Sequence, residues 1–350
     1  MRIEQLTFTR FLAAISIVIF HYGDQIFLFN NKYVQFIFGQ ANIGVSYFFI
    51  LSGFVMIIAY NTNSKINFFQ YLKNRLARIY PVYLFAIFLI VFLSFLHKST
   101  DLEAIFLSVF MIQAWFPEKV HVINGPGWSI SVEFLFYILF PFLFNCIYKK
   151  RSYKTIIWPI LIIWIISQIT SNLLFNNITI NGVSFQVTEN LCYFPLIHVN
   201  EFLIGNLAGL YFVTNSNKIR NNYDWHIIGI VVVFALFLKF PINWYPYNGV
   251  FALLFVPLII LLSSNNGKLT TLFKKKIFVF LGEISFGVYI LQKPVFKWLS
   301  DKQTGKYFLM DRIDNVNMAF FVKFFSLLLL ASLSYIYFEK PIREKIKNIF

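Results

Sequence analysis

The chemistry most readily inferred from the sequence belongs to an arginine and a histidine in the first apolar segment. Arg10 and His21 are 11 residues apart, which is roughly 16 Å along a helix at about 1.5 Å per residue. This spacing is about 20° from a whole number of turns, so the two side chains share one helix face. Histidine is well suited to proton transfer near neutral pH. We therefore expect Arg10 at the cytoplasmic interface and His21 as a catalytic base near the bilayer midplane. A histidine that only packs against a backbone carbonyl is the alternative.

A second cationic pair could bind phosphate. Arg75 and Arg78 are three residues apart, a spacing that puts both guanidinium groups on one helix face. Arginine forks bind phosphate oxygens in bidentate fashion. Together with Arg10 they could hold the phosphates of a nucleotide-bearing donor such as coenzyme A. Anchoring to anionic lipid headgroups explains the same pattern, and the spacing alone leaves both interpretations open.

A carboxylate follows a turn sequence in the segment 125–133, Gly-Pro-Gly-Trp-Ser-Ile-Ser-Val-Glu. We place the turn on the outer side and Glu133 about one helical turn inside the membrane, where it needs a partner. It could orient or charge-balance His21 as the second member of a catalytic dyad. A structural salt bridge is the alternative. The nearby residues that we expect to contact substrate are Trp128, Ser129 and Ser131.

The remaining ionisable residues in apolar surroundings have simpler interpretations. Glu201 and Glu283 each lie in an apolar run, and we expect them to form ion pairs that stabilise the helix bundle rather than to act in catalysis. Four histidines fall in loops or near the ends of apolar runs, where interfacial packing explains them: His97, His121, His198 and His226.

These residues require a membrane-embedded helical scaffold. The chain is 58% hydrophobic and only 13% charged, whereas a soluble domain carries about 25% charged residues. The sequence predicts an all-α, polytopic transmembrane bundle and a single domain over 1–350. The ten spans that we expect are approximately 8–24, 42–60, 79–97, 128–148, 155–175, 197–213, 226–240, 249–264, 278–296 and 317–338. The apolar stretch 104–116 is too short to cross and is expected to be re-entrant or interfacial.

The net charge of +15 reflects membrane orientation rather than nucleic-acid binding. Basic residues cluster at helix ends, as the positive-inside rule requires, and both termini are predicted to be cytoplasmic. Counting 104–116 as a span would place the basic loop 149–154 outside. The two cysteines form no spaced framework, so neither a disulfide nor a metal site is predicted. On this topology 20 of the 30 basic residues are cytoplasmic: Arg2, Arg10, Lys65, Lys73, Arg75, Arg78, Lys149, Lys150, Arg151, Lys154, Lys218, Arg220, Lys268, Lys274, Lys275, Lys276, Lys340, Arg343, Lys345 and Lys347.

The order and spacing of these motifs resemble those of the acyltransferase-3 family of membrane O-acyltransferases, whose members acylate bacterial surface polysaccharides such as O-antigens. Each element is weak alone, and the set covers most of the chain. The matching elements are Arg-x10-His at Arg10 and His21, the run 44–54, Arg-x-x-Arg at Arg75 and Arg78, Trp-Ser-x-Ser-x-Glu at 128–133, Glu-Phe-Leu-x-Gly at Glu201, Leu-Gly-x-Ile-Ser at 281–285 and Glu-Lys-Pro at Glu339.

The resemblance implies acetyl-coenzyme A as the donor, an essential first-span histidine, a glycan or lipid-linked sugar as the acceptor, and ten core spans in the bacterial inner (cytoplasmic) membrane. Two departures are visible. Gln292 follows Tyr289-Ile290-Leu291, where family members often carry a histidine, and no SGNH hydrolase-like domain follows within this sequence. We expect direct transfer or passage of the acyl group to a separate protein. A sugar transporter and a non-catalytic membrane scaffold are the alternative functions.

Overall fold

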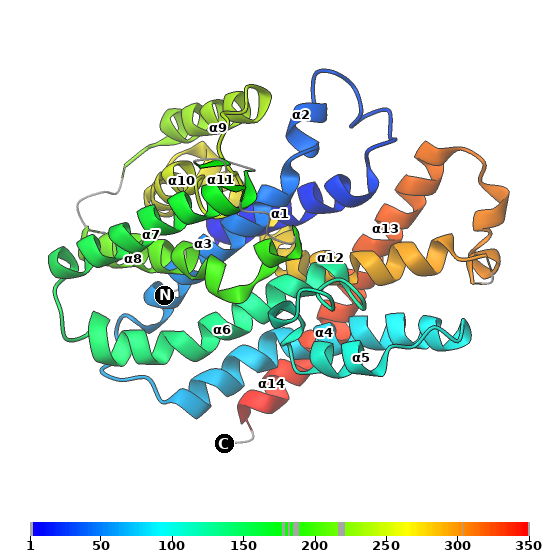
Figure 1. Cartoon of the computed structure of the whole chain (residues 1–350), viewed down its shortest axis with the longest axis horizontal. Coiled ribbons are helices and arrows are strands. Elements are labelled where there is room, and N and C mark those ends of the chain that lie inside the picture. The colour runs from blue at the N-terminus through cyan, green and yellow to red at the C-terminus, as the bar shows by residue number, and fades with distance from the viewer. Residues whose placement is uncertain are drawn as a thin grey trace. The chain divides into compact units, whose positions relative to one another are not determined.

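The computed structural model describes residues 3–176, 179–180, 183–184, 189–215, 221–302 and 304–348, and Figure 1 shows it to be built of helices. Arg2, Lys218 and Arg220 of the charge tally lie outside the described residues. The α-helices are α1 Gln5–Tyr22, α2 Gln35–Phe38, α3 Gly44–Tyr60, α4 Phe68–Leu96, α5 Leu102–Val109, α6 Trp128–Leu143, α7 Tyr153–Phe175, α8 Val199–Asn215, α9 Asp224–Lys239, α10 Ala252–Ser264, α11 Lys268–Phe273, α12 Lys276–Ser300, α13 Val316–Ser334 and α14 Lys340–Asn348.

Shorter elements join or extend these helices. Wide π-type turns η4 (Phe144–Tyr148) and η9 (Tyr335–Glu339) continue α6 and α13. The 3-10 turns are η1 Ala41–Ile43, η2 Gln113–Trp115, η3 Gly125–Gly127, η5 Glu189–Tyr193, η6 Pro195–His198, η7 Gly305–Phe308 and η8 Met310–Arg312. Within the described ranges, the strands are the two-residue β1 (Thr179–Ile180) and β2 (Val183–Ser184), which pair antiparallel. The predicted helical class is therefore confirmed, with this one small hairpin added.

Eight helices among the described residues are long and apolar enough to cross a membrane. They correspond to eight of the ten predicted spans. The other two, predicted at 226–240 and 249–264, are α9 and α10, which have 16 and 13 residues and fall short of the ~20 residues that a straight crossing needs. These candidate spans are Gln5–Tyr22, Ala41–Tyr60, Phe68–Leu96, Gly125–Tyr148, Tyr153–Phe175, Pro195–Asn215, Lys276–Ser300 and Val316–Ile346.

The segment predicted to be re-entrant is a short, firmly capped helix. The α5 helix has eight residues, and the Asp101 carboxylate accepts a 3.0 Å hydrogen bond from the backbone N–H of Ala104. Lys119 pairs with Asp101 at 2.9 Å and with Glu103 at 2.8 Å. The Ala104 N–H and Lys119 hold the pKa of Asp101 below its usual range. A helix of this length does not span a bilayer.

The helices form two compact units that interleave along the sequence. Unit 1 comprises Met1–Ala13, Asn42–Phe68 and Val132–Gly282, and unit 2 comprises Ala14–Ala41, Phe69–Ser131 and Glu283–Phe350. Helices α1, α6 and α12 each contribute residues to both units. That the two units act as one membrane domain stays a prediction.

Glycines bring two helices of unit 1 into close contact. A Cβ atom added to Gly205 of α8 would lie 2.0 Å from the Ile50 carbonyl oxygen of α3. One added to Gly53 of α3 would lie 2.3 Å from the Phe202 carbonyl oxygen of α8. Small residues allow helix backbones in a membrane to approach in this way. The motifs at 44–54 and at Glu201 therefore meet at a single helix crossing, where α3 and α8 run side by side (Figure 1).

Polar contacts join the helices of unit 2. The Trp298 indole nitrogen donates a 2.8 Å hydrogen bond to the Leu89 carbonyl oxygen, which ties α12 to α4. Beyond α12, Asp301 pairs with His97 at 2.7 Å. The backbone N–H of Phe27 donates to the Asn317 side chain at 2.9 Å, which ties the loop after α1 to α13.

Candidate functional site

His21 lies in the last turn of α1. The helix ends one residue later, at Tyr22, so the imidazole belongs to the end of the first span rather than to its middle. The helix ends two residues before the predicted boundary, and the expected depth of His21 near the bilayer midplane stays a prediction. The His21 side chain is exposed, and its ring meets Phe20 edge-on with centroids 5.1 Å apart. Arg10 stands on the same unbroken helix, as predicted.

Unit 2 surrounds this end of α1 with an aromatic and a second histidine. The Tyr22 ring stacks on Phe296 of α12 with centroids 3.9 Å apart and planes at 16°. The charge of His121 acts on His21, which places the two imidazoles near one another. The Lys293 ammonium donates a 2.9 Å hydrogen bond to the His121 carbonyl oxygen. His121 and Lys293 thus belong to the surroundings of this end of α1 within unit 2.

His121 and Lys293 were missed as site residues by the sequence analysis, which assigned His121 to interfacial packing. Burial lowers the pKa of His121, the positive charge of Lys293 adds to this effect, and a hydrogen bond with the backbone of Gly125 opposes it. Neither residue belongs to a motif, and 100 positions separate His21 from His121. The sequence carries no local signal that could have joined them.

Glu133 has a close partner on its own helix. Its Oε1 accepts a 2.7 Å hydrogen bond from the Tyr137 hydroxyl, one turn further along α6. The carboxylate is half-buried, so this bond offsets part of the cost of removing it from water. Glu133 lies in unit 1 and His21 in unit 2. The predicted dyad between them stays a prediction.

The serines before Glu133 hold the turn that opens α6. The Ser129 hydroxyl donates to the Pro126 carbonyl oxygen at 3.0 Å and shares a 2.9 Å hydrogen bond with the Tyr289 hydroxyl. The Ser131 hydroxyl is fully buried and accepts from the Ala114 N–H at 3.4 Å. Trp128 is half-buried. These bonds give both serines a structural role, and the substrate contacts expected of the three residues stay predictions.

The arginine pair lies at the end of α4 that precedes its apolar part. The Arg75 guanidinium lies over the Tyr71 ring, 5.3 Å from its centroid. The charges of Arg78 and Arg343 both act on Glu339, where Ser334 also donates a 3.3 Å hydrogen bond. Arg10 belongs to unit 1, where its charge acts on Tyr47. A joint cluster of Arg10, Arg75 and Arg78 stays a prediction.

Glu283 and Glu339, which belong to two of the sequence motifs, lie near one another in this charged region of unit 2. The Tyr335 hydroxyl donates a 2.9 Å hydrogen bond to Glu283 of α12, and the charges of Glu283 and Glu339 act on one another. The charge of Arg343 also acts on Tyr335. Glu283 therefore contributes to a polar network with Tyr335 and Glu339, and the ion pair expected for it stays a prediction.

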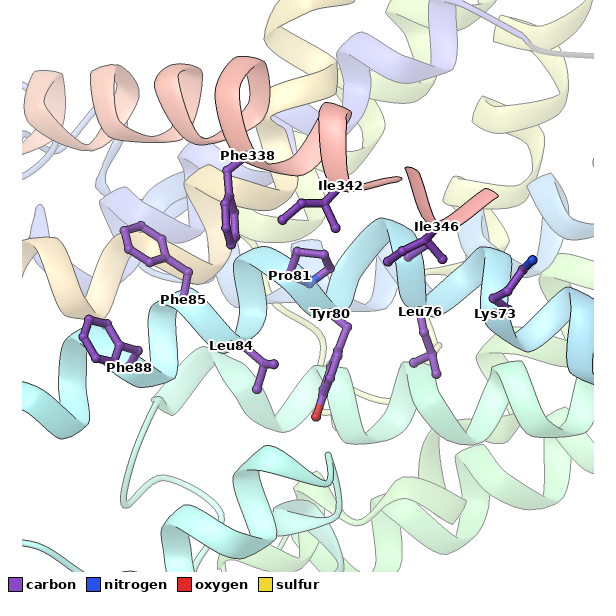
Figure 2. Close-up of a pocket in the computed structure, with 11 residues that line it drawn as sticks. Lys73, Leu76, Tyr80, Pro81, Leu84, Phe85, Phe88, Phe338, Ile342 and Ile346 are labelled. Atoms are coloured by element: carbon purple, nitrogen blue, oxygen red, sulfur yellow. The ribbon is translucent and has the colours of Figure 1, made fainter. Parts of the chain in front are cut away.

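An apolar groove lies along α4 beside this network. It has a volume of about 540 Å³. Figure 2 shows Lys73 at one end and Phe88 at the other, with Phe338, Ile342 and Ile346 above α4. The other lining residues are Leu76, Ala77, Tyr80, Pro81, Leu84 and Phe85. Because its walls are almost wholly apolar, the groove suits hydrocarbon and not the phosphates of a nucleotide.

Glu201 of unit 1 is buried in a fully paired polar cluster. Its carboxylate accepts a hydrogen bond from the Ser46 hydroxyl and bonds to His198 Nδ1 at 2.7 Å. His198 Nε2 bonds to the Cys192 carbonyl oxygen at 2.9 Å. All three side chains are at most 4% exposed. Glu201 thus has a close histidine partner, and the ion pair predicted for it forms when that imidazole is protonated. His198 lies near the start of the apolar helix Pro195–Asn215, and its imidazole is enclosed with Glu201. The hydroxyl faces the carboxylate rather than the imidazole, so this is no nucleophilic triad.

The described residues contain no group of three or more histidines, cysteines, aspartates or glutamates that could hold a metal ion. The side chains described above offer imidazole, carboxylate, ammonium and guanidinium groups. Imidazole can move a proton, and the cations can bind anionic groups.

Comparison with known proteins identifies the family. Residues 3–337 match the family whose description reads acyltransferase domain, the acyltransferase-3 family. The chain is 26% identical over 223 residues to the acyltransferase MdmB of Streptomyces mycarofaciens, covering 60% of this chain and 57% of that protein. It is 24% identical over 370 aligned positions to the O-acetyltransferase OatA of Staphylococcus aureus, covering 96% of this chain and 56% of that protein.

The chain spans about half the length of these two relatives. No solved structure matches it. The family match extends over nearly every described helix, from α1 into η9. The protein therefore belongs to the acyltransferase-3 family.

Proposed function

We propose that this protein is a membrane O-acyltransferase that moves an acetyl group from cytoplasmic acetyl-coenzyme A to a hydroxyl of a cell-surface polysaccharide or lipid-linked glycan. The match over residues 3–337 carries the proposal. The names of two relatives, an acyltransferase and an O-acetyltransferase, support the reaction class. The proposed location is the bacterial inner membrane, with both termini in the cytoplasm.

His21 acts as the base in the proposed mechanism. The imidazole removes the proton of the acceptor hydroxyl as its oxygen attacks the thioester carbonyl. The tetrahedral intermediate then collapses, the carbon–sulfur bond breaks, and the imidazolium returns the proton to the leaving thiolate. Glu133 is the proposed partner that orients or charge-balances His21. A relay in which the imidazole itself carries the acyl group uses the same residues and stays open.

Arg75 and Arg78, with Arg10, are the proposed donor site. They would grip the phosphates of acetyl-coenzyme A in bidentate fashion. Arg78, Arg343 and Arg75 outnumber Glu283 and Glu339 around the start of α4, so a net positive charge remains for an anionic donor. Roughly 16 Å of helix separates Arg10 from His21, so the bound donor would extend along the first span to bring its thioester to His21.

Reconstitution tests the proposed reaction. The purified chain is placed in proteoliposomes with acetyl-coenzyme A labelled in the acetyl group, and a panel of glycans is supplied on the opposite face. The account predicts labelled glycan and free coenzyme A in equal amounts. A transporter would move labelled glycan across the bilayer without consuming the donor, and a scaffold would do neither. Either of those results contradicts the proposal.

A further inference from the structure

A charged pocket lies at the end of unit 2 that holds His21. Its volume is about 540 Å³, and its walls come from the segment after α1, the second half of α12, and the region where α13 begins. Three lysines line it, Lys293 and Lys297 on α12 and Lys323 on α13, together with the carboxylates of Asp24 and Asp314. The pocket therefore has a cationic surplus, in contrast to the apolar groove along α4.

Two of the lysines are held in place by unit 2 itself. Lys293 donates to the His121 carbonyl oxygen at 2.9 Å, and Lys323 donates to the Ser300 hydroxyl at 2.7 Å. Both are half-buried. An ammonium group has three N–H donors, so each of these bonds fixes the direction of the side chain and leaves donors for a ligand. The two carboxylates are exposed and so lie at the rim.

The remaining polar and aromatic walls suit a sugar. Tyr22, stacked on Phe296, gives an aromatic surface, and the side chains of Gln25 and Ser300 offer hydrogen-bond partners. Aromatic rings bind the apolar faces of sugars, while amides, hydroxyls and carboxylates bond to their hydroxyls. Tyr22 directly follows His21 in the chain. A glycan seated here would lie within one helical turn of the proposed base.

The sequence around the pocket carries an unusual charge. On the proposed topology ten basic residues lie outside, and six of them fall between positions 293 and 323, against three aspartates: Lys293, Lys297, Lys302, Lys306, Arg312 and Lys323, with Asp301, Asp311 and Asp314. The positive-inside rule leads us to expect few basic residues on the outer side of the membrane. A concentration of them beside a pocket therefore points to a ligand of opposite charge rather than to membrane orientation.

We propose that this pocket binds the acceptor, and that the acceptor is a glycan bearing an anionic group, a phosphate or a carboxylate, near the hydroxyl that is acylated. This inference rests on the proposed function. Lys293, Lys297 and Lys323 bind the anionic group, Tyr22 supports the sugar ring, and the hydroxyl is directed toward His21.

The test compares acceptors of one backbone that differ only in charge. A neutral disaccharide, its uronic acid and its 6-phosphate are supplied to the full chain in phosphatidylcholine vesicles with labelled acetyl-coenzyme A. The wild type is expected to show a KM at least tenfold lower for a charged acceptor than for the neutral one. Lys297→Gln and Lys323→Gln each raise that KM about tenfold, without changing the KM for acetyl-coenzyme A. Lys302→Gln, an exposed lysine outside the pocket lining, is the matched control and leaves both values unchanged.

Direct binding separates this inference from the proposed reaction. Titration of the solubilised protein with the disaccharide 6-phosphate is expected to show saturable binding that Lys297→Gln with Lys323→Gln removes and Lys302→Gln does not. Such binding without any acetyl transfer contradicts the proposed function and supports the anion pocket. Transfer that is equal for all three acceptors and insensitive to the lysine substitutions overturns the inference alone. An effect of the lysines that appears only when the vesicles contain phosphatidylglycerol assigns the pocket to a lipid headgroup and also overturns it.

Discussion

The ring of Tyr22 stacks on that of Phe296 with 3.9 Å between their centroids. This contact fixes the end of α1 against α12 within unit 2, and His21 is the residue immediately before it. The orientation of the proposed base therefore depends on a residue 275 positions away in sequence. His121 and Lys293 approach the same end of α1, so its surroundings are set by three separate stretches of chain.

Because His121 is half-buried, we expect the stability of the folded protein to depend on pH. Burial lowers the pKa of His121 below the ordinary 6.5, so below about pH 6.5 the unfolded chain binds a proton that the folded chain does not. Stability is therefore fully present above pH 6.5 and falls as the pH drops toward the lower folded pKa. Thermal unfolding in detergent between pH 7.5 and 5 should show this fall, and His121→Gln should reduce it. His226→Gln, an exposed histidine, is the control. Identical profiles for His121→Gln and wild type would contradict the assignment.

The buried Glu201 cluster predicts a large effect of charge removal. Glu201→Ala leaves the Ser46 hydroxyl and the His198 imidazole without their acceptor, and loss of one partner from a buried pair costs about 3–5 kcal/mol. Glu201→Gln keeps an acceptor oxygen and should cost less. Folded yield and thermal unfolding measure the difference. Glu103→Ala removes a surface ion pair with Lys119, and because that pair is exposed to solvent we expect little loss of stability. Equal effects of the two alanine variants would refute the structural role of Glu201.

A matched pair of glycine substitutions tests the close packing of α3 against α8. Gly205→Ala places a Cβ atom 2.0 Å from the Ile50 carbonyl oxygen, and a backbone atom cannot move aside cheaply. We expect a loss of at least 2 kcal/mol or of folded protein, since overpacking typically costs about 1–3 kcal/mol. Gly229→Ala in α9 meets nothing within 4 Å and should be neutral or slightly stabilising. Size-exclusion profiles and thermal unfolding of both variants decide the matter, and a stable Gly205→Ala variant contradicts the packing.

The proposed donor site predicts separate effects on the two substrates. Arg75→Gln and Arg78→Gln each remove a bidentate phosphate contact, so the KM for acetyl-coenzyme A should rise about tenfold or more, as expected for a charge-assisted bond of about 1.5–3 kcal/mol. The KM for the glycan should not change. Arg151→Gln, an exposed arginine in the loop before α7, is the matched control. If Arg151→Gln has the same effect as the other two, general surface charge explains the result.

Composition and helix-length apolar runs were sufficient to predict most of the fold. They gave the helical class and the short helix near 104–116, because both follow from local hydrophobicity and length. Two of the ten predicted spans correspond to α9 and α10, which are apolar but only 16 and 13 residues long, so the number of spans stays a prediction. The ends of helices depend on capping and tertiary contacts that a hydrophobic run does not encode.

The candidate site was predictable only where its residues share a helix. The spacing of Arg10 and His21 places both residues on one helix face, and the same is true of Arg75 and Arg78. His121, Lys293 and Lys323 come together only through tertiary packing, and the sequence gives no periodic signal for such a meeting. The pairing of His198 with Glu201 was not predicted for a related reason. The two residues are three positions apart, but their burial depends on Ser46 and the rest of α3.

The central claim is that His21 moves the proton in acyl transfer, and one comparison of rates tests it most directly. Single-turnover transfer of labelled acetyl from acetyl-coenzyme A to a glycan is measured for the wild type, His21→Ala and His226→Ala in the same vesicles. Removal of a general base costs about 10²–10⁴-fold in rate, so we predict that loss for His21→Ala and a wild-type rate for His226→Ala. A folded His21→Ala protein that transfers acetyl at the wild-type rate would contradict the account.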